Sequence, residues 1–131
     1  MIEKLLALQK NSYVPITGYH TSSIVVMKDG EMFEGVNVEN PSFRDGICAE
    51  QNAIANAISH GYKKGDFALL YVMTDGDKPS TPCFLCRQVI NELIENKVPV
   101  ICYDKKGDVV IYDVGKLCPH PFDESDLVWG V

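Results

Sequence analysis

The chain has 131 residues, 46% of them hydrophobic, and a formal net charge of −6 at pH 7. This length predicts one domain over residues 1–131 with a sizeable buried core. The acidic charge argues against nucleic acid as a partner. The lack of any apolar run near the roughly 20 residues of a membrane span argues against a membrane.

The five cysteines are an odd number, whereas a secreted disulfide framework usually contains an even number. The N-terminal stretch also lacks the long apolar centre of a signal peptide. Together these features predict a reduced, cytoplasmic setting.

The first half of the chain predicts a short amphipathic helix, a β-hairpin and a second helix. Periodic apolar residues indicate the helices, and the Asp29-Gly30 turn between two β-branched runs indicates the hairpin. The expected ranges are a helix over 2–10, a loop over 11–18, strands over 22–28 and 32–38, an irregular segment over 40–46 and a helix over 48–59.

The second half alternates strands and helices. The segment 67–74 is continuously apolar, which is typical of a strand covered on both faces. The remaining expectations are a loop over 75–82, a helix over 83–96, strands over 99–103 and 109–112, and a short terminal helix over 123–128. This order predicts an α/β protein with one mixed sheet and helices on its faces.

Two short cysteine segments carry the strongest chemical signal. Cys48 is followed two residues later by Glu50, and Cys83 and Cys86 form a Pro-Cys-x-x-Cys motif. Three thiolates and a nearby carboxylate are what a hydrolytic zinc site with one open position requires. A CxxC motif alone is a weak signal, but the ordered combination is a strong one. The alternative is that the three cysteines are ordinary buried thiols.

Both cysteine segments begin predicted helices, where free N–H groups and the helix dipole favour the thiolate. Cys83 and Cys86 are one helical turn apart, so their side chains lie side by side. Cys48 must occupy the very first position of its helix if Glu50 is to face the same site. There Glu50 can accept a proton from water and later return it to a leaving amine. The alternative is a surface glutamate stabilised at a helix start.

These motifs resemble the small cytidine deaminases of the homotetrameric, three-cysteine zinc type. The resemblance runs from about Tyr13 to Leu127. Its matching elements are Asn37-Val38-Glu39-Asn40, Cys48-Ala49-Glu50, Pro82-Cys83-x-x-Cys86-Arg87-Gln88, Leu117-x-Pro119-x-x-Phe122 and Asp126-Leu127. It implies a three-layer α/β/α sandwich with a five-stranded mixed sheet, a Zn2+ cofactor bound by the three cysteines, and catalysis by Glu50.

The resemblance also implies roles in binding a pyrimidine nucleoside. It assigns Asn37 and Glu39 to the ribose hydroxyls, and Tyr19 and Ala49 to the substrate pocket. It implies a homotetramer in which Phe122 reaches a neighbouring subunit's active site. From the residues alone, Asn37 could equally be a turn partner and Glu39 a solvated residue, and aromatic side chains beside prolines usually pack.

Several positions depart from the family pattern. Gln51 and Phe84 stand where the family usually has Arg and Gly, and Tyr19 takes the place of Phe. The segment Thr21–Ile24 replaces an apolar stretch, which predicts a more polar pocket wall. We expect Arg87 and the helix N-termini to offset the thiolate charge that Gln51 cannot neutralise. We expect Phe84 to narrow the site or to pack behind it.

The expected function is zinc-dependent hydrolytic deamination of cytidine or deoxycytidine, a step of pyrimidine salvage. One alternative is deamination of a related amino-pyrimidine nucleoside, as in the blasticidin-type enzymes. Another is a slow or inactive zinc protein that binds nucleosides as an oligomer.

Overall fold

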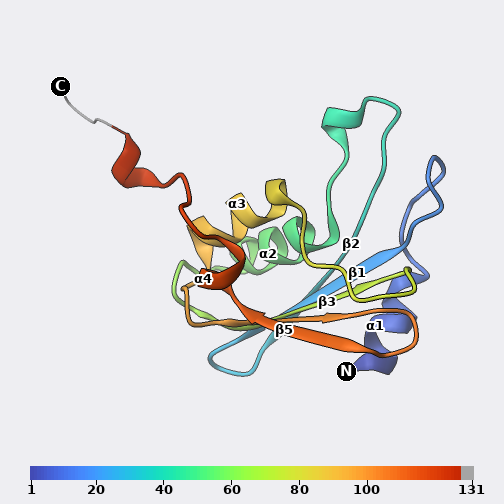
Figure 1. Cartoon of the computed structure of the whole chain (residues 1–131), viewed down its shortest axis with the longest axis horizontal. Coiled ribbons are helices and arrows are strands. Elements are labelled where there is room, and N and C mark those ends of the chain that lie inside the picture. The colour runs from blue at the N-terminus through green and yellow to red at the C-terminus, as the bar shows by residue number, and fades with distance from the viewer. Residues whose placement is uncertain (128–131) are drawn as a thin grey trace.

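The computed structural model describes residues 1–127, whose strands form one five-stranded mixed sheet (Figure 1). The strands are β1 (Thr21–Met27), β2 (Met32–Val36), β3 (Phe67–Thr74), β4 (Pro99–Tyr103) and β5 (Val109–Asp113). Their order in the sheet is β2-β1-β3-β4-β5. Only the β3–β4 pair is parallel, and the other neighbours are antiparallel. The predicted mixed sheet is therefore confirmed.

The helices are α1 (Ile2–Gln9), η1 (Phe43–Asp45), α2 (Ala49–Ser59), α3 (Phe84–Leu93), α4 (Val114–Leu117) and η2 (Glu124–Asp126). The first two expected helices are present, the third is shorter than expected, and the turns η1 and α4 were not predicted. The helix expected over 83–96 ends at Leu93, because Ile94 is extended and buries its side chain in the core. The terminal helix expected over 123–128 is only the single turn η2, and residue 128 lies outside the described residues.

Two apolar clusters lie on opposite faces of the sheet and make the fold three-layered. On one face, α2 and α3 pack against the larger cluster, which includes Val25 and Met27 of β1. On the other face, α1 contributes Leu5 to a smaller cluster with Ile24 and Met73. Successive residues of a strand point to opposite faces, so β1 serves both clusters. Figure 1 shows α2 and α3 above the sheet and α1 at its lower side.

A close approach between β2 and α2 fixes the start of the second helix. A Cβ atom on Gly35 would lie 2.3 Å from the backbone N of Ala53 and 2.5 Å from the backbone O of Ala49. No side chain fits at that distance, so glycine lets the helix lie directly on the strand. The residues before and at the beginning of α2 are thereby held above the sheet.

The loops that flank this helix start are tied to one another by single β-bridges. Val38 pairs with Tyr13 and with Ile47, which links the loop after α1 to the two ends of the 40–46 segment. In Figure 1 these two loops rise on the same side of the molecule, next to the N-terminal ends of α2 and α3.

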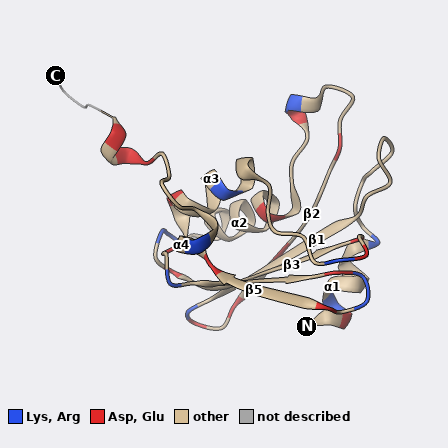
Figure 2. Cartoon of the chain, viewed as in Figure 1, with Lys and Arg blue, Asp and Glu red and all other residues tan. Residues whose placement is uncertain are grey.

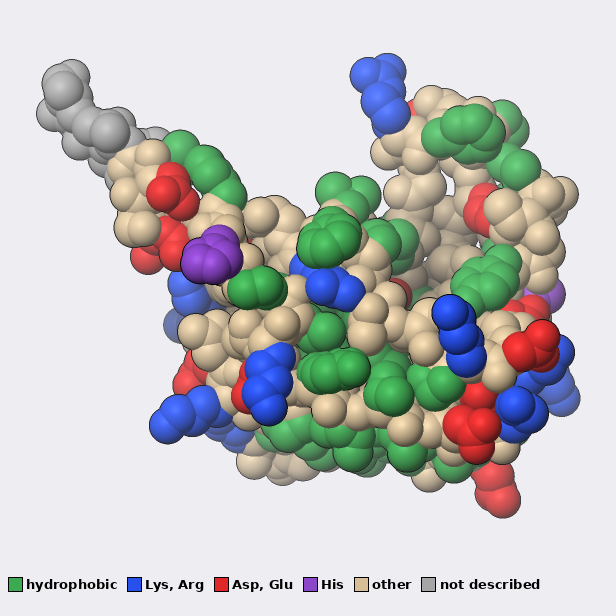
Figure 3. Space-filling model, in the orientation of Figure 1, with side chains coloured by type: hydrophobic (Ala, Val, Ile, Leu, Met, Phe, Trp, Pro, Cys, Tyr) green, Lys and Arg blue, Asp and Glu red, His purple; other side chains and the backbone are tan. Residues whose placement is uncertain are grey.

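Charged side chains are spread around the molecule rather than gathered on one face. Figure 2 shows Lys and Arg at separate places along the chain, with acidic residues between them. Apolar side chains form a band across the face shown in Figure 3. Within residues 1–127, no helix combines the length and hydrophobicity that a membrane crossing would need.

Candidate active site

Three cysteines from two helix starts come together, as the expected zinc site requires. Cys48 is the N-cap of α2, Cys83 is the N-cap of α3, and Cys86 lies in the first turn of α3. Their Sγ atoms all lie within 4.8 Å of one another, and those of Cys83 and Cys86 are 3.5 Å apart. Because Cys48 precedes the helix in an extended conformation, it meets the constraint that it occupy the first position.

The geometry and chemistry of this trio fit a zinc ion. Tetrahedral coordination with Zn–S bonds of about 2.3 Å places sulfurs about 3.8 Å apart. The 3.5 Å between Cys83 and Cys86 and the 4.8 Å upper limit for all three pairs are compatible with that value. In the described part of the chain, the group of candidate ligands consists of these three cysteines alone. Three protein ligands are typical of catalytic zinc sites, which keep a fourth position for water or substrate.

Hydrogen bonds among the sulfurs favour a thiolate at Cys48. The bond from Cys86 lowers the pKa of Cys48 to about 7, whereas the same bond and burial raise the pKa of Cys86. Gln51 adds a donor from the first turn of α2, with its Nε2 3.7 Å from the Sγ of Cys86. The glutamine therefore gives a sulfur a hydrogen bond without bringing a charge.

Arg87 does not direct its hydrogen bonds to the cysteines, and the expectation that its charge helps to offset theirs stays a prediction. It donates to the backbone O of Pro82 at 2.7 Å, the backbone O of Leu117 at 3.0 Å and the Oγ1 of Thr81 at 2.7 Å. These bonds fix the segment that precedes Cys83 against the end of α4. Arg87 therefore positions the loop that leads into Cys83.

Glu50 lies in the first turn of α2 and is only 5% exposed. Its burial raises the pKa of its carboxyl group. Because a buried carboxyl group resists ionisation, it holds a proton more readily than a carboxyl group in water. Ala49, beside it, is fully buried.

A cavity of about 260 Å³ joins Cys48, Cys83 and Glu50 to most of the predicted substrate residues. It is lined by Tyr19, Thr21, Asn37, Cys48, Ala49, Glu50, Val72, Thr74, Ser80, Thr81 and Cys83. A second cavity of about 260 Å³ shares Asn37 and Cys48 with it and includes Glu39. The sequence interpretation missed the lining residues from β3 and the 75–82 loop, because an apolar strand and a turn-rich loop carry no catalytic signature.

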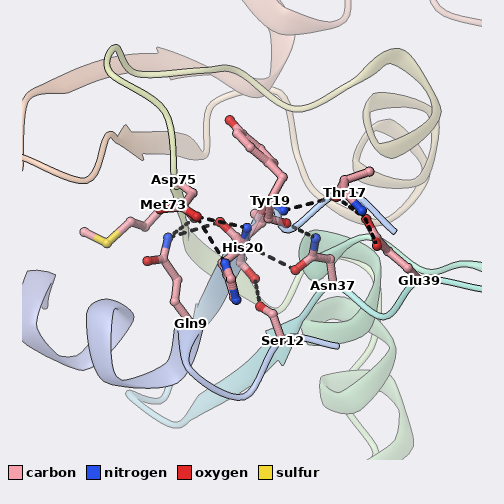
Figure 4. A network of polar contacts seen from close by, with 10 residues as sticks. Gln9, Ser12, Thr17, Tyr19, His20, Asn37, Glu39, Met73 and Asp75 are labelled. Atoms are coloured by element: carbon pink, nitrogen blue, oxygen red, sulfur yellow. Dashed lines mark hydrogen bonds and ion pairs between the residues drawn. The ribbon is translucent and has the colours of Figure 1, made fainter. Parts of the chain in front are cut away.

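Asn37 and Glu39 already hold backbone segments in this structure, as Figure 4 shows. The Oδ1 of Asn37 accepts from the backbone N of Thr21 at 3.0 Å, and its Nδ2 donates to the backbone O of Tyr19 at 2.8 Å. Glu39 accepts from the backbone N of Ile16 and from the backbone N and hydroxyl of Thr17. These bonds shape the rim of the cavity, and a role in ribose binding stays a prediction.

The two aromatic residues near α3 lie outside the cavity that contains Glu50. Phe84 is 78% exposed, and the guanidinium carbon of Arg87 lies 4.5 Å from its ring centroid. The expectation that Phe84 narrows the site or packs behind it is therefore wrong. Phe122 is 57% exposed and lies in the C-terminal segment, which extends from the body in Figure 1.

The fold and the cysteine cluster define an α/β protein with a mononuclear thiolate metal site of the hydrolytic type. Residues 1–102 match the family model of the cytidine and deoxycytidylate deaminase zinc-binding region, and the chain belongs to this family. The family's zinc is the metal that the three cysteines bind, and the expected cofactor is confirmed.

Individual relatives match over nearly the whole chain. The sequence is 35% identical over 130 residues to a cytidine deaminase of Sporosarcina psychrophila, covering 96% of this chain and 94% of that protein. It is 32% identical to a cytidine deaminase of Halalkalibacterium halodurans, covering 97% and 95%. The crystal structure of a cytidine deaminase from Burkholderia pseudomallei superposes with a TM-score of 0.89 at 36% identity, covering 92% and 95%.

Proposed function

We propose that this protein removes the amino group of cytidine or deoxycytidine by hydrolysis, giving uridine or deoxyuridine and ammonia. The observation that carries the proposal is one cavity that contains Glu50 beside three convergent thiols. Two relatives named cytidine deaminase that match almost end to end support the choice of substrate. The activity belongs to pyrimidine salvage, and we place it in the cytoplasm and in a single domain.

Glu50 manages the protons of the reaction. Zinc held by the three cysteines supplies a Lewis acid that makes water reactive at neutral pH. Glu50 accepts the proton that the attacking water loses and delivers it to a ring nitrogen of the base. The same carboxyl group then takes the second proton from the hydroxyl group added to the ring carbon and passes it to the amine. The C–N bond breaks as the carbonyl forms, and ammonia departs. A pKa raised by burial suits a group that must both take and return a proton near neutral pH.

The rim residues bind the sugar. Asn37 and Glu39 face the two adjoining cavities, and each retains free acceptor or donor capacity beyond its bonds to the backbone. A ribose diol can hydrogen-bond to both side chains. Tyr19 lines the cavity with its ring, and the small side chain of Ala49 leaves room for the base.

The assembled enzyme is a homotetramer in which Phe122 completes a neighbouring active site. The exposed apolar side chains around α3, Phe84 and Leu85, support burial of this surface against another subunit. Gln88 holds the backbone O of Phe122 at 2.8 Å, which fixes where the C-terminal segment leaves the body. An aromatic ring delivered from that segment can stack on a pyrimidine bound in the next subunit.

The test is the Glu50→Gln variant of the zinc-loaded protein. Glutamine keeps the size and polarity of the side chain but cannot take up a proton. We expect the zinc content and melting temperature to stay near those of the unmodified protein, and ammonia release from cytidine to fall by at least about 100-fold. Turnover near the unmodified rate would refute the mechanism. Absence of zinc from the variant would transfer the test to Glu50→Asp.

A further inference from the structure

His20 and Asp75 hold together two segments that border the cavity containing Glu50. The Nδ1 of His20 lies 3.1 Å from the Oδ2 of Asp75, and the backbone N of His20 donates to the same oxygen at 3.4 Å. His20 immediately precedes β1, and Asp75 immediately follows β3. Figure 4 shows the two residues next to each other, with the ring of Tyr19 pointing away from these bonds. The pair therefore joins the segment before β1 to the 75–82 loop, which leads into Cys83.

This pair lies where the β1–β3 ladder would otherwise continue. The ladder ends at Thr21 and Thr74, and its antiparallel register, extended by one residue, puts His20 opposite Asp75. There the contact runs through the carboxylate of Asp75 instead of a backbone carbonyl. A carboxylate that bridges two backbones leaves more room between them than a direct backbone hydrogen bond does. The two segments thus diverge beside the cavity while they stay connected.

The next residues of both segments extend this contact to the cavity. The same register puts Tyr19 opposite Gly76, and a Cβ atom on Gly76 would lie 3.4 Å from the Oη of Tyr19. The phenol group of Tyr19 therefore lies close to the backbone of the 75–82 loop. Tyr19 lines the cavity together with Ser80 and Thr81 of that loop. The position of the loop thus determines the space between Tyr19 and the opposite wall.

The backbone of His20 is anchored separately from its side chain. The Nε2 of Gln9, a residue that is only 7% exposed, lies 3.3 Å from the backbone O of His20 and 3.0 Å from the backbone O of Met73. This amide connects the start of β1 to the end of β3 without the imidazole. Removing the imidazole should therefore release the 75–82 loop and leave the sheet intact.

We infer that His20 is a positioning residue for substrate binding, which acts through Asp75 and Tyr19. The inference rests on the proposed function and identifies what sets the width of its cavity. Because His20 holds the first residue of the 75–82 loop, a nucleoside enters a cavity whose walls are already in place. Without this bond the loop and the Tyr19 ring must become ordered on binding, which costs affinity for substrate and product alike.

The experiment compares His20→Leu with His20→Asn in the zinc-loaded protein. Leucine removes the nitrogen that contacts Asp75, whereas the amide nitrogen of asparagine can take the place of Nδ1. Asp75→Ala removes the same contact from the other side. Asp77→Ala is the matched control, because Asp77 belongs to the same loop but pairs with Lys105 at 3.1 Å and has an 87% exposed side chain. The measurements are kcat and KM for cytidine, and binding of the product uridine by calorimetry.

We expect His20→Leu and Asp75→Ala each to raise KM and to weaken uridine binding by about 3- to 5-fold, the size of one partly exposed hydrogen bond. The value of kcat should stay within about 1.5-fold, since the bond serves substrate and transition state equally. His20→Asn should recover most of the lost affinity, and Asp77→Ala should leave KM unchanged. The double variant of His20→Leu and Asp75→Ala should lose no more than either single variant.

Unchanged KM and uridine affinity in His20→Leu would overturn the inference and leave the proposed function standing. An equal loss in Asp77→Ala would overturn it too, because any anchor of the loop would then have the same effect. An unmodified protein that binds uridine but releases no ammonia from cytidine would instead refute the proposed function. Weaker uridine binding by His20→Leu would still support the inference in that case, whereas no uridine binding at all would refute both.

Discussion

Gln51 is the side chain in contact with the cysteine cluster that brings a donor without a charge. Its Nε2 lies 3.7 Å from the Sγ of Cys86. Three thiolates around one divalent cation carry net negative charge, and Arg87 spends its hydrogen bonds on two backbone carbonyls and the Thr81 hydroxyl instead. The Gln51 N–H thus donates directly to a sulfur and stabilises its negative charge, although Gln51 does not itself bind the metal.

Changing Gln51 should therefore change how tightly zinc is held. We expect Gln51→Leu to weaken zinc affinity by about 10-fold, because residues that hydrogen-bond to metal ligands commonly have effects of this size. Gln51→Arg should hold zinc at least as tightly as the unmodified protein and raise the rate of deamination. Competition with a chromophoric chelator measures the affinity. An unchanged affinity in Gln51→Leu would show that the 3.7 Å contact has no energetic role.

A second residue pair links the β1–β2 turn to the segment after α2. The hydroxyl of Tyr62 donates to Asp29 Oδ2 at 2.7 Å. This bond lowers the pKa of Asp29 below 3.8 and raises the pKa of Tyr62 to about 12. The lowered pKa of Asp29 adds stability at pH values above its pKa in the unfolded chain, and this contribution is lost as pH falls. The raised pKa of Tyr62 adds stability at pH values below about 10, and this contribution is lost as pH rises towards about 12.

The Tyr62→Phe variant should remove both effects. We expect the pKa of Asp29 to rise towards its ordinary value, and the acid limb of the stability curve to start at slightly higher pH. Carboxyl chemical shifts followed by NMR during an acid titration report the Asp29 pKa directly. Asp123 serves as an internal control in the same titration, since its carboxylate accepts from Ser125 and not from Tyr62.

At the scale of elements, the contact between β2 and α2 places Glu50. The missing side chain of Gly35 allows the backbone of α2 to lie against the strand at Ala49 and Ala53. Any Cβ atom there would collide with backbone atoms, which cannot rotate away as a side chain can. The helix would have to lift from the sheet, and its first turn would move with it.

Gly35→Ala should consequently destabilise the fold and impair the site together. We expect a loss of about 1–3 kcal/mol or more in the free energy of unfolding, measured by urea denaturation. Gly115→Ala is the matched control, because its Cβ would meet its nearest neighbours at 3.4 Å or more. A Gly35→Ala protein with unchanged stability would mean that the strand and helix can separate at no cost.

The strands were predictable because their side chains satisfy two requirements at once. The segments 67–74 and 99–103 are apolar enough to be covered on both faces, and both strands were predicted with the bounds that the structure has. The C-terminal bound of α3 was not predictable, because Ile94 is as apolar as the core residues of a helix. Its extended conformation depends on its packing in the core beside the sheet. The four-residue α4 is too short to show a period.

The residues of the site were also predictable only in part. The cysteines and Glu50 were identified because their chemistry demands particular residue types at fixed spacings. Thr74 was not, since a threonine that ends an apolar strand resembles any other β-branched residue until the cavity is seen. The outward direction of Phe84 depends on how α3 is rotated against the sheet, which its sequence alone does not specify.

At the scale of the whole molecule, the metal joins two helices that have few direct contacts of their own. Cys48 belongs to the start of α2, and Cys83 and Cys86 belong to the start of α3. A cation bound by all three fastens these segments together, and binding to the folded state alone adds to its stability. Cys102, by contrast, is buried in the sheet, and its burial raises its pKa to about 12.

Removing zinc with a chelator should therefore lower the melting temperature and expose a defined set of thiols. At pH 8 we expect the exposed Cys83 and Cys48, whose pKa is lowered to about 7, to be alkylated first, and Cys102 to stay unmodified while the protein is folded. Peptide mass spectrometry identifies the labelled residues, and the zinc-loaded protein should protect all three cysteines of the cluster. Labelling of Cys102 before Cys83 would contradict this structure of the core.

The guanidinium of Arg87 donates hydrogen bonds to the carbonyl groups of Pro82 and Leu117, which lie 35 residues apart in the sequence. A displacement of the C-terminal segment would therefore move the residue that precedes Cys83, because Arg87 bonds to both segments. If another subunit binds the C-terminal segment, subunit assembly would then affect the positions of the cysteine ligands. The affinity of the cysteine site for its metal ion would then differ between a free subunit and an assembled one.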